Sequence, residues 1–98
     1  MNTTFTARKF NASQNLQDFA TEEIQKLNRY YDGILSVDIV LEPTPDNDEP
    51  AKAELTVKVK NDLLNATEKG VAYEHALRSA VDNMRRQLIK YKDKRFSR

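Results

Sequence analysis

The chain has 98 residues, no cysteine, one histidine and two glycines, and its formal net charge is +1. A chain of this length supports one hydrophobic core, so we expect residues 1–98 to form a single domain. Without thiols, a second histidine or a glycine-rich loop, it lacks the usual nucleophile, metal and phosphate sites. We therefore expect no enzyme activity, no metal and no cofactor. No apolar run typical of a signal peptide or a membrane span is present, which favours a cytoplasmic protein.

The first half of the chain predicts a strand, a helix and a second strand. Residues 3–9 are rich in Thr and Phe and are typical of a short strand. Apolar residues then recur at helical spacing, with Ser13 as the expected N-cap and Gly33 as the expected C-terminal stop. Residues 34–42 alternate between apolar and polar, so Leu35 and every second residue after it should share the apolar face of a strand.

The second half predicts two more strands and a long helix. The acidic, proline-rich residues 43–50 exclude a helix or an inner strand and predict a mobile hairpin loop. Residues 51–60 alternate strictly and predict a strand, followed by a tight turn at 61–62 and a short strand at 63–67. From Gly70 onward the apolar period is helical. The predicted apolar face of this helix comprises Tyr73, Leu77, Ala80, Val81, Met84, Leu88 and Tyr91.

The predicted element order is therefore β-α-β-β-β-α, an α+β fold. We expect an antiparallel-rich sheet of four strands with one apolar face and one solvent face. The two helices should pack on the apolar face of the sheet, because each has one apolar stripe to bury.

Charge is divided unevenly along the chain. Residues 78–98 hold eight basic and two acidic residues, a net charge of +6, whereas residues 1–77 have a net charge of −5. Cations near the end of a helix interact favourably with its dipole, but one or two would satisfy that interaction. The basic end would attract a polyanion, which predicts a nucleic-acid partner.

Helical geometry places most of these cations in two rows that flank the apolar face of the last helix. The first row comprises Arg78, Arg85 and Lys92, and the second comprises Arg86, Lys90 and Lys94. Arg95 extends the basic end. Such rows can neutralise the phosphates of a nucleic-acid backbone. Their aliphatic stems could instead only cover the edge of the core.

Several observations favour RNA over DNA as the polyanion. The sequence has no helix-turn-helix or zinc-finger pattern, and its strands lack the stacking aromatic residues of an RNA-recognition motif. We therefore expect RNA to be recognised by shape and backbone, with no DNA partner. Of the aromatic pair that ends the first helix, Tyr31 is predicted to join the core, and Tyr30 to be a wet edge or a stacking group.

The remaining polar residues indicate no chemistry. His75 is expected to be a surface or seam residue of the last helix. Asp46, Asp48 and Glu49 lack the spacing and the glycine of a calcium-binding loop, so we interpret them as a solubilising loop tip.

Two segments resemble the hibernation-promoting factor family, which includes the ribosome-associated inhibitor protein Y. They are KLNRY, residues 26–30, and RQLIKYKDK, residues 86–94, and the resemblance extends over nearly the whole chain. It implies a β-α-β-β-β-α fold similar in layout to a double-stranded-RNA-binding domain. It also implies binding to the 16S-type rRNA of the small ribosomal subunit, in the channel for messenger RNA and for transfer RNA in the A and P sites. Translation would be inhibited there in stationary phase or stress.

The resemblance also implies which residues contact rRNA. Matched by position, these are Lys26 and Arg29 on the first helix and Arg86, Lys90, Lys92 and Lys94 on the last. Arg78, Arg85 and Arg95 are included for their charge, although Arg78 stands where relatives often have an acid.

The length resembles the short form of the family, which lacks the domain that pairs ribosomes, and we expect a monomer when the protein is free. A different hypothesis is a small protein-interaction module, in which the basic helix only keeps the chain soluble. The acidic loop or an open sheet edge would then meet the partner. Salt dependence separates the two hypotheses, because phosphate contacts weaken steeply with ionic strength.

Overall fold

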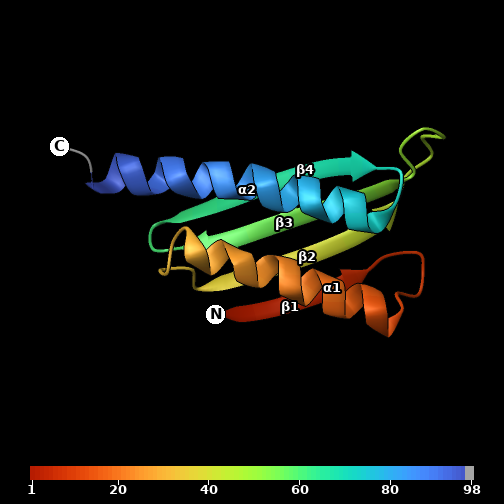
Figure 1. Ribbon diagram of the computed structural model, residues 1–98, viewed down its shortest axis with the longest axis horizontal. Helices are drawn as coiled ribbons and strands as arrows, with labels where there is room; N and C mark the ends of the chain where they lie inside the picture. Colours follow the sequence, from red (N-terminus) through yellow and green to blue (C-terminus); the bar gives the residue numbers. More distant parts are fainter. Residues whose placement is uncertain (97–98) are drawn as a thin grey trace.

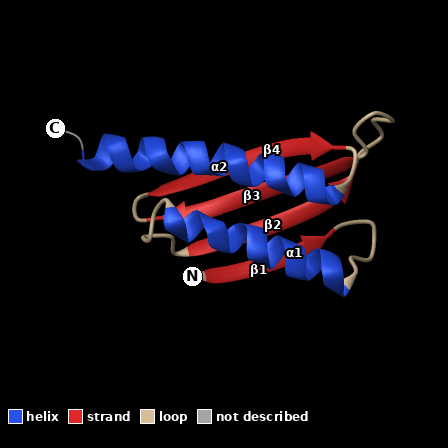
Figure 2. Cartoon of the chain, viewed as in Figure 1, coloured by secondary structure: helices blue, strands red, loops and turns tan. Residues whose placement is uncertain are grey.

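The computed structural model describes residues 1–96, and of residues 95 and 96 only the backbone. Four strands and two helices follow one another in the order β-α-β-β-β-α, which confirms the predicted α+β fold (Figures 1 and 2). A short 3-10 helix, η1, continues the first helix. The elements are β1 (Asn2–Ala7), α1 (Gln14–Gln25), η1 (Lys26–Arg29), β2 (Ser36–Pro43), β3 (Ala51–Val59), β4 (Asp62–Gly70) and α2 (Tyr73–Phe96).

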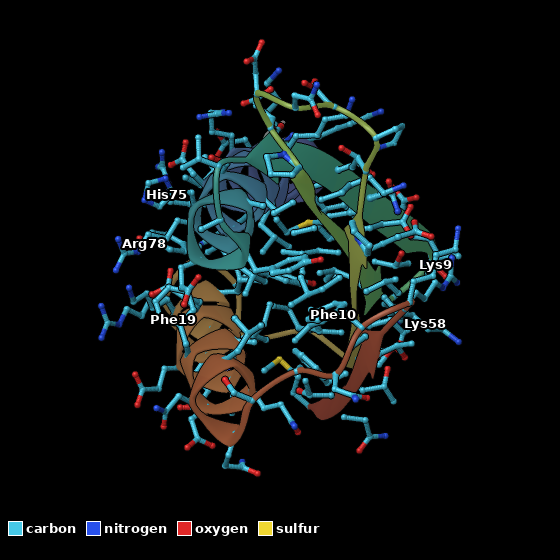
Figure 3. The ribbon with its side chains drawn as sticks, turned by 90° about the vertical axis from the view of Figure 1, so that its right-hand side faces the viewer. Lys9, Phe10, Phe19, Lys58, His75 and Arg78 are labelled. Atoms are coloured by element: carbon cyan, nitrogen blue, oxygen red, sulfur yellow. The ribbon has the colours of Figure 1, made fainter. Side chains whose placement is uncertain are left out.

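The sheet has the strand order β1-β2-β3-β4. The β2–β3 and β3–β4 pairs are antiparallel, whereas β1 runs parallel to β2, with Thr3 opposite Val37. The parallel pair follows from the connection, because α1 crosses over the sheet between these two strands. Both helices lie on the same face of the sheet, and Figure 3 shows Lys58 on the opposite, open face.

One hydrophobic core lies between the sheet and the two helices. Every second residue of β2 and β3 points into it, so that each strand has one buried and one solvent face. Both helices contribute the apolar stripes that their sequences predict. The largest fully buried side chains are Ile24, Leu27, Val37, Ile39, Leu41, Leu55, Val57, Val59, Leu77, Met84 and Leu88.

The first helix begins as predicted but ends earlier. Ser13 is its N-cap, and the Ser13 Oγ accepts a hydrogen bond of 3.1 Å from the backbone N–H of Leu16. The prediction that Gly33 stops the helix is wrong, because α1 ends at Gln25 and Gly33 does not have a positive φ. Gly33 instead leaves room for an aromatic ring, since an added Cβ would lie 2.6 Å from the Tyr31 hydroxyl.

Several strand boundaries also differ from the prediction, including that of β1, which ends at Ala7. Leu35 is 52% exposed, because β2 begins only at Ser36 and Ile34 turns into the core in its place. The tight turn lies at residues 60–61, where Asn61 has a φ of 72°, and β4 is longer than predicted. An asparagine tolerates this left-handed backbone better than most residues, so the turn chemistry was right although its position was one residue off.

The segment between β2 and β3 is the predicted hairpin loop, closed by its own hydrogen bonds. The Thr44 N–H donates to the Pro50 carbonyl at 2.8 Å. The Asp46 Oδ1 accepts the backbone N–H groups of Asp48 at 2.9 Å and of Glu49 at 3.3 Å. These donors lower the pKa of the Asp46 carboxyl, because they stabilise its charged form.

The molecule is elongated, with extents of 46 × 24 × 19 Å. The acidic hairpin loop lies at one end of the long axis, and the C-terminal turns of α2 project past the sheet at the other (Figure 1). The charge asymmetry of the sequence is thus also an asymmetry in space. Within the described residues, none of the helices combines the length and the apolar character needed to cross a membrane.

Candidate nucleic-acid interface

The last helix packs against the sheet through a seam that includes Leu77, Met84 and Leu88, all fully buried. This seam fixes the rotation of α2 and leaves three sides of the helix for other contacts. One flank turns toward α1, the other turns toward β4, and the outer side faces solvent. The two predicted rows of cations occupy these two flanks.

The row that faces α1 lies over aromatic side chains. The Arg78 guanidinium is 5.1 Å from the centroid of the Phe19 ring, and both residues lie on the helix side of the molecule in Figure 3. The Arg85 guanidinium is 5.7 Å from the centroid of the Tyr30 ring. A cation over the face of an aromatic ring is attracted by the ring quadrupole. These two arginines are therefore held in place before any partner binds.

The row that faces β4 has different surroundings. Lys90 and Lys94 line a shallow hollow of about 220 Å³ together with Leu64 and Tyr91. Arg86 starts this row, and its side chain is 59% exposed. Lys90 and Lys94 are exposed beside the sheet edge, whereas Arg86 pairs with a carboxylate on the outer side of the helix.

Asp82 connects the two rows on the outer side of the helix. Its Oδ1 accepts hydrogen bonds from Arg85 Nη2 at 2.9 Å and from Arg85 Nε at 3.2 Å, and its Oδ2 pairs with Arg86. The hydrogen bonds from Arg85 and the charge of Arg86 lower the pKa of the Asp82 carboxyl. One carboxylate thus orients two guanidinium groups, one from each row.

A polar row that the sequence reasoning missed anchors the β4 side of the helix. Asn83 Nδ2 donates to Glu68 Oε2 at 2.8 Å, Gln87 Nε2 donates to the Asn65 carbonyl at 2.7 Å, and the Tyr91 hydroxyl donates to the Lys60 carbonyl at 2.6 Å. The three donors are spaced by four residues, between the apolar seam and the basic row. That four-residue spacing was the one signal of this row in the sequence. It could not be interpreted alone, because the acceptors on β4 and on the turn before it are distant in sequence.

The two cations predicted on the first helix separate in the structure. Lys26 Nζ lies 2.6 Å from Glu23 Oε2, and Glu23 is only 7% exposed. Lys26 therefore balances a nearly buried carboxylate, which leaves less of its charge for a phosphate. Arg29 lies in η1 and lines a second hollow together with Lys92. The side chain of Arg95 lies outside the described part of the structure.

This second hollow lies between the end of the first helix and the projecting part of α2. Its volume is about 430 Å³. The lining residues are Asn28, Arg29, Tyr30, Tyr31, Asp32 and Lys92. Tyr31 is half-buried and meets Tyr91 edge to face, with ring centroids 5.4 Å apart, so it belongs to the core edge as predicted. Tyr30 is half-buried at the rim.

The other candidate residues lie away from this interface. His75 is exposed on the first turns of α2, which agrees with the surface position, one of the two predicted for it (Figure 3). The loop acids Asp46, Asp48 and Glu49 are engaged by the backbone or face solvent. Among the residues that the structure describes, no group of three or more His, Cys, Asp or Glu side chains could hold a metal ion.

The fold and the charge distribution define a small α+β domain that presents a basic helix at one end. A family model described as Sigma 54 modulation protein / S30EA ribosomal protein matches residues 3–95, and the chain belongs to this family. The match confirms the family resemblance inferred from the sequence. No protein in the curated set matches the chain at the sequence level.

Two solved structures have the same fold. The Thermus thermophilus Protein Y N-terminal domain superposes with a TM-score of 0.81 at 25% identity, covering 93% of this chain and 99% of that one. A ribosomal subunit interface protein from Coxiella burnetii superposes with a TM-score of 0.83 at 17% identity, covering 94% of this chain and 98% of that one. The chain thus shares its fold with the Protein Y N-terminal domain and with a ribosomal subunit interface protein.

Proposed function

We propose that this protein is a ribosome hibernation factor that binds the 16S-type rRNA of the small ribosomal subunit. It occupies the channel for messenger RNA and for the transfer RNAs of the A and P sites, and so inhibits translation in stationary phase or stress. It acts in the cytoplasm as a monomer and without catalysis. Membership of the family and the basic helix support this proposal.

The observation that carries the proposal is the pair of cation rows along α2. From Arg78 to Lys94 the helix rises about 24 Å, so its cations can meet several phosphates of one RNA segment. Each phosphate that a cation neutralises releases condensed counterions, which makes binding favourable and strongly dependent on salt. Because the rows lie on opposite flanks, the helix can sit in a groove with RNA on both sides.

The position of the acidic residues supports the same orientation. The hairpin loop with Asp46, Asp48 and Glu49 lies at the far end of the molecule from the projecting basic turns (Figure 1). An RNA surface attracts one end and repels the other. The C-terminal end of α2 would therefore enter the RNA channel first, with the loop toward its opening.

Co-sedimentation with ribosomes and with separated subunits tests the proposal. We expect the protein to pellet with the small subunit and with whole ribosomes at low salt, and to be released as salt rises. The large subunit alone is the matched control and should retain little protein. A folded protein that stays in the supernatant at low salt would overturn the proposal and leave the protein-interaction module as the better hypothesis.

A cell-free translation assay tests the position on the subunit. We expect inhibition to increase with protein concentration and to decrease when messenger RNA is loaded on the ribosomes first, because both compete for the same channel. Binding without inhibition would mean that the protein contacts rRNA elsewhere.

A further inference from the structure

We propose that the hollow between η1 and α2 binds one unpaired nucleotide of the RNA, with the base stacked on Tyr30 and the phosphate between Arg29 and Lys92. This inference rests on the proposed function, because it takes RNA as the partner. It adds that one nucleotide is recognised out of the helical stack, whereas the cation rows alone contact any RNA backbone.

The size and charge of the hollow suit one nucleotide. Its volume of about 430 Å³ lies within the range of roughly 300–1,000 Å³ typical of small-ligand pockets. Arg29 and Lys92 supply two positive charges and Asp32 one negative charge among the lining residues. The excess of one positive charge matches a single phosphodiester and disfavours a polyphosphate. Asn28 and Asp32 add hydrogen-bonding groups for the edge of a base.

Tyr30 is the residue that can make the site selective for an unpaired base. Unpaired bases are commonly stacked on aromatic side chains, whereas the bases of a helix are covered by their neighbours. Tyr30 lines the hollow, and its ring centroid lies 5.7 Å from the guanidinium of Arg85, which is not among the lining residues. Asp82 in turn holds Arg85. The ring thus has one contact with a held arginine and is half-buried where it lines the hollow, and there a base could stack on it.

The hollow on the other flank of α2 provides the comparison. It is about half as large, and its lining includes Lys90, Lys94 and the aliphatic side chain of Leu64. Its aromatic residue is Tyr91, whose hydroxyl donates a hydrogen bond to the Lys60 carbonyl. With Asp62 it has the same net lining charge as the hollow beside η1, so the two hollows differ in volume and in their tyrosine, since the Tyr91 ring also meets Tyr31 edge to face. Selectivity for an unpaired nucleotide should therefore depend on the hollow beside η1.

The test uses two RNA hairpins that differ only by one bulged 2-aminopurine, titrated with the 98-residue protein at low salt. Base stacking on an aromatic side chain predicts that the wild type prefers the bulged hairpin by roughly five- to a hundred-fold. It should also quench the fluorescence of the bulged base. Tyr30→Phe should keep both effects and Tyr30→Leu should lose both, with circular dichroism confirming that each variant is folded.

Lys92→Gln and Lys94→Gln are a matched pair for the phosphate contact. Each removes one positive charge, and the two positions lie within one turn of the same helix but on its opposite flanks. Lys94→Gln should weaken both hairpins equally, whereas Lys92→Gln should weaken the bulged hairpin more. Equal affinity of the wild type for the two hairpins, or a preference that survives in Tyr30→Leu, would overturn the inference. Ribosome co-sedimentation of the same proteins tests the proposed function separately. A protein that pellets with ribosomes but does not prefer the bulged hairpin would contradict this inference alone.

Discussion

The two flanks of α2 carry the same number of cations in the two predicted rows, yet their surroundings differ. On the flank toward α1, Arg78 and Arg85 lie over aromatic rings, and Lys92 borders a hollow with Tyr30. On the flank toward β4, Lys90 and Lys94 lie at a sheet edge. The two flanks therefore carry the same charge, but their cations are held in place to different degrees.

The difference separates two contributions to binding. Cations that face solvent attract a polyanion from a distance and are weakened by salt. Cations that are held against aromatic rings lose less conformational freedom when they bind, so they favour one geometry of the partner. We expect the β4 flank to determine the strength of attraction and the α1 flank to determine how the RNA is positioned.

The largest effect should come from reversing charge on the β4 flank. The double variant Arg86→Glu with Lys90→Glu replaces two phosphate contacts by repulsion, and we expect ribosome affinity to fall by about 100-fold. The slope of log affinity against log salt should decrease by about two. Both positions are exposed, so the unfolding transition should change little.

The matched control for this variant lies on the open face of the sheet. Lys58→Glu with Lys69→Glu makes the same change in net charge on exposed residues. Figure 3 shows Lys58 on the open face, and Lys69 is exposed in the alternating burial pattern of β4. Its effect on ribosome affinity should be within a few fold, because only net charge changes. Equal losses for the two double variants would show that total charge, and not the helix, controls binding.

The second largest effect should come from the different contributions that the cations on the two flanks make to the stability of the protein. Arg78→Gln with Arg85→Gln removes both ring contacts and the surface hydrogen bonds from Arg85 to Asp82, and it should lower the free energy of unfolding by about 1–2 kcal/mol. Lys90→Gln with Lys94→Gln removes the same charge from the other flank and should change it by less than about 0.5 kcal/mol. Urea denaturation measures both. If the two pairs unfold alike, the aromatic contacts do not hold the arginines.

The sequence predicted the parts of this arrangement that depend on local geometry. The two rows and the apolar seam follow from helical periodicity, and the N-cap at Ser13 follows from the hydrogen bond that a serine offers to the first turn. The strands follow from their alternation. These features depend on neighbours in the chain and need no knowledge of the packing.

The parts that could not be predicted depend on residues distant in sequence. Nothing local to Arg78 indicates that Phe19 lies beneath it, and nothing local to Gly33 indicates that the ring of Tyr31 folds back over it. Leu35 fits the alternation but lies beyond the sheet that would have buried it. The family resemblance placed the rRNA contacts on both helices. It did not anticipate that Lys26 is paired with a buried carboxylate.

A smaller effect should come from the polar row that holds α2 on the β4 side. Tyr91→Phe removes the hydrogen bond to the Lys60 carbonyl and keeps the ring contact with Tyr31. We expect the free energy of unfolding, measured by thermal unfolding, to fall by about 0.5–1.5 kcal/mol. Ribosome affinity should not change. Tyr30→Phe is the control, because it preserves the ring near Arg85, and it should unfold at nearly the wild-type temperature. A loss of affinity in Tyr91→Phe at unchanged stability would mean that this hydroxyl contacts RNA.

The smallest effect concerns Asp82, which joins the two flanks. Its pKa is lowered in the folded protein by the hydrogen bonds from Arg85 and the charge of Arg86. Its contribution to stability is therefore fully present above the ordinary aspartate pKa of about 4, and is lost as pH falls through the lower folded value. Asp82→Asn should be slightly less stable than the wild type at neutral pH, and the difference should vanish in acid. Thermal unfolding of both proteins across this pH range measures it. If the difference persisted in acid, the ionised carboxylate would not be what orients Arg85 and Arg86, and the two flanks would act independently.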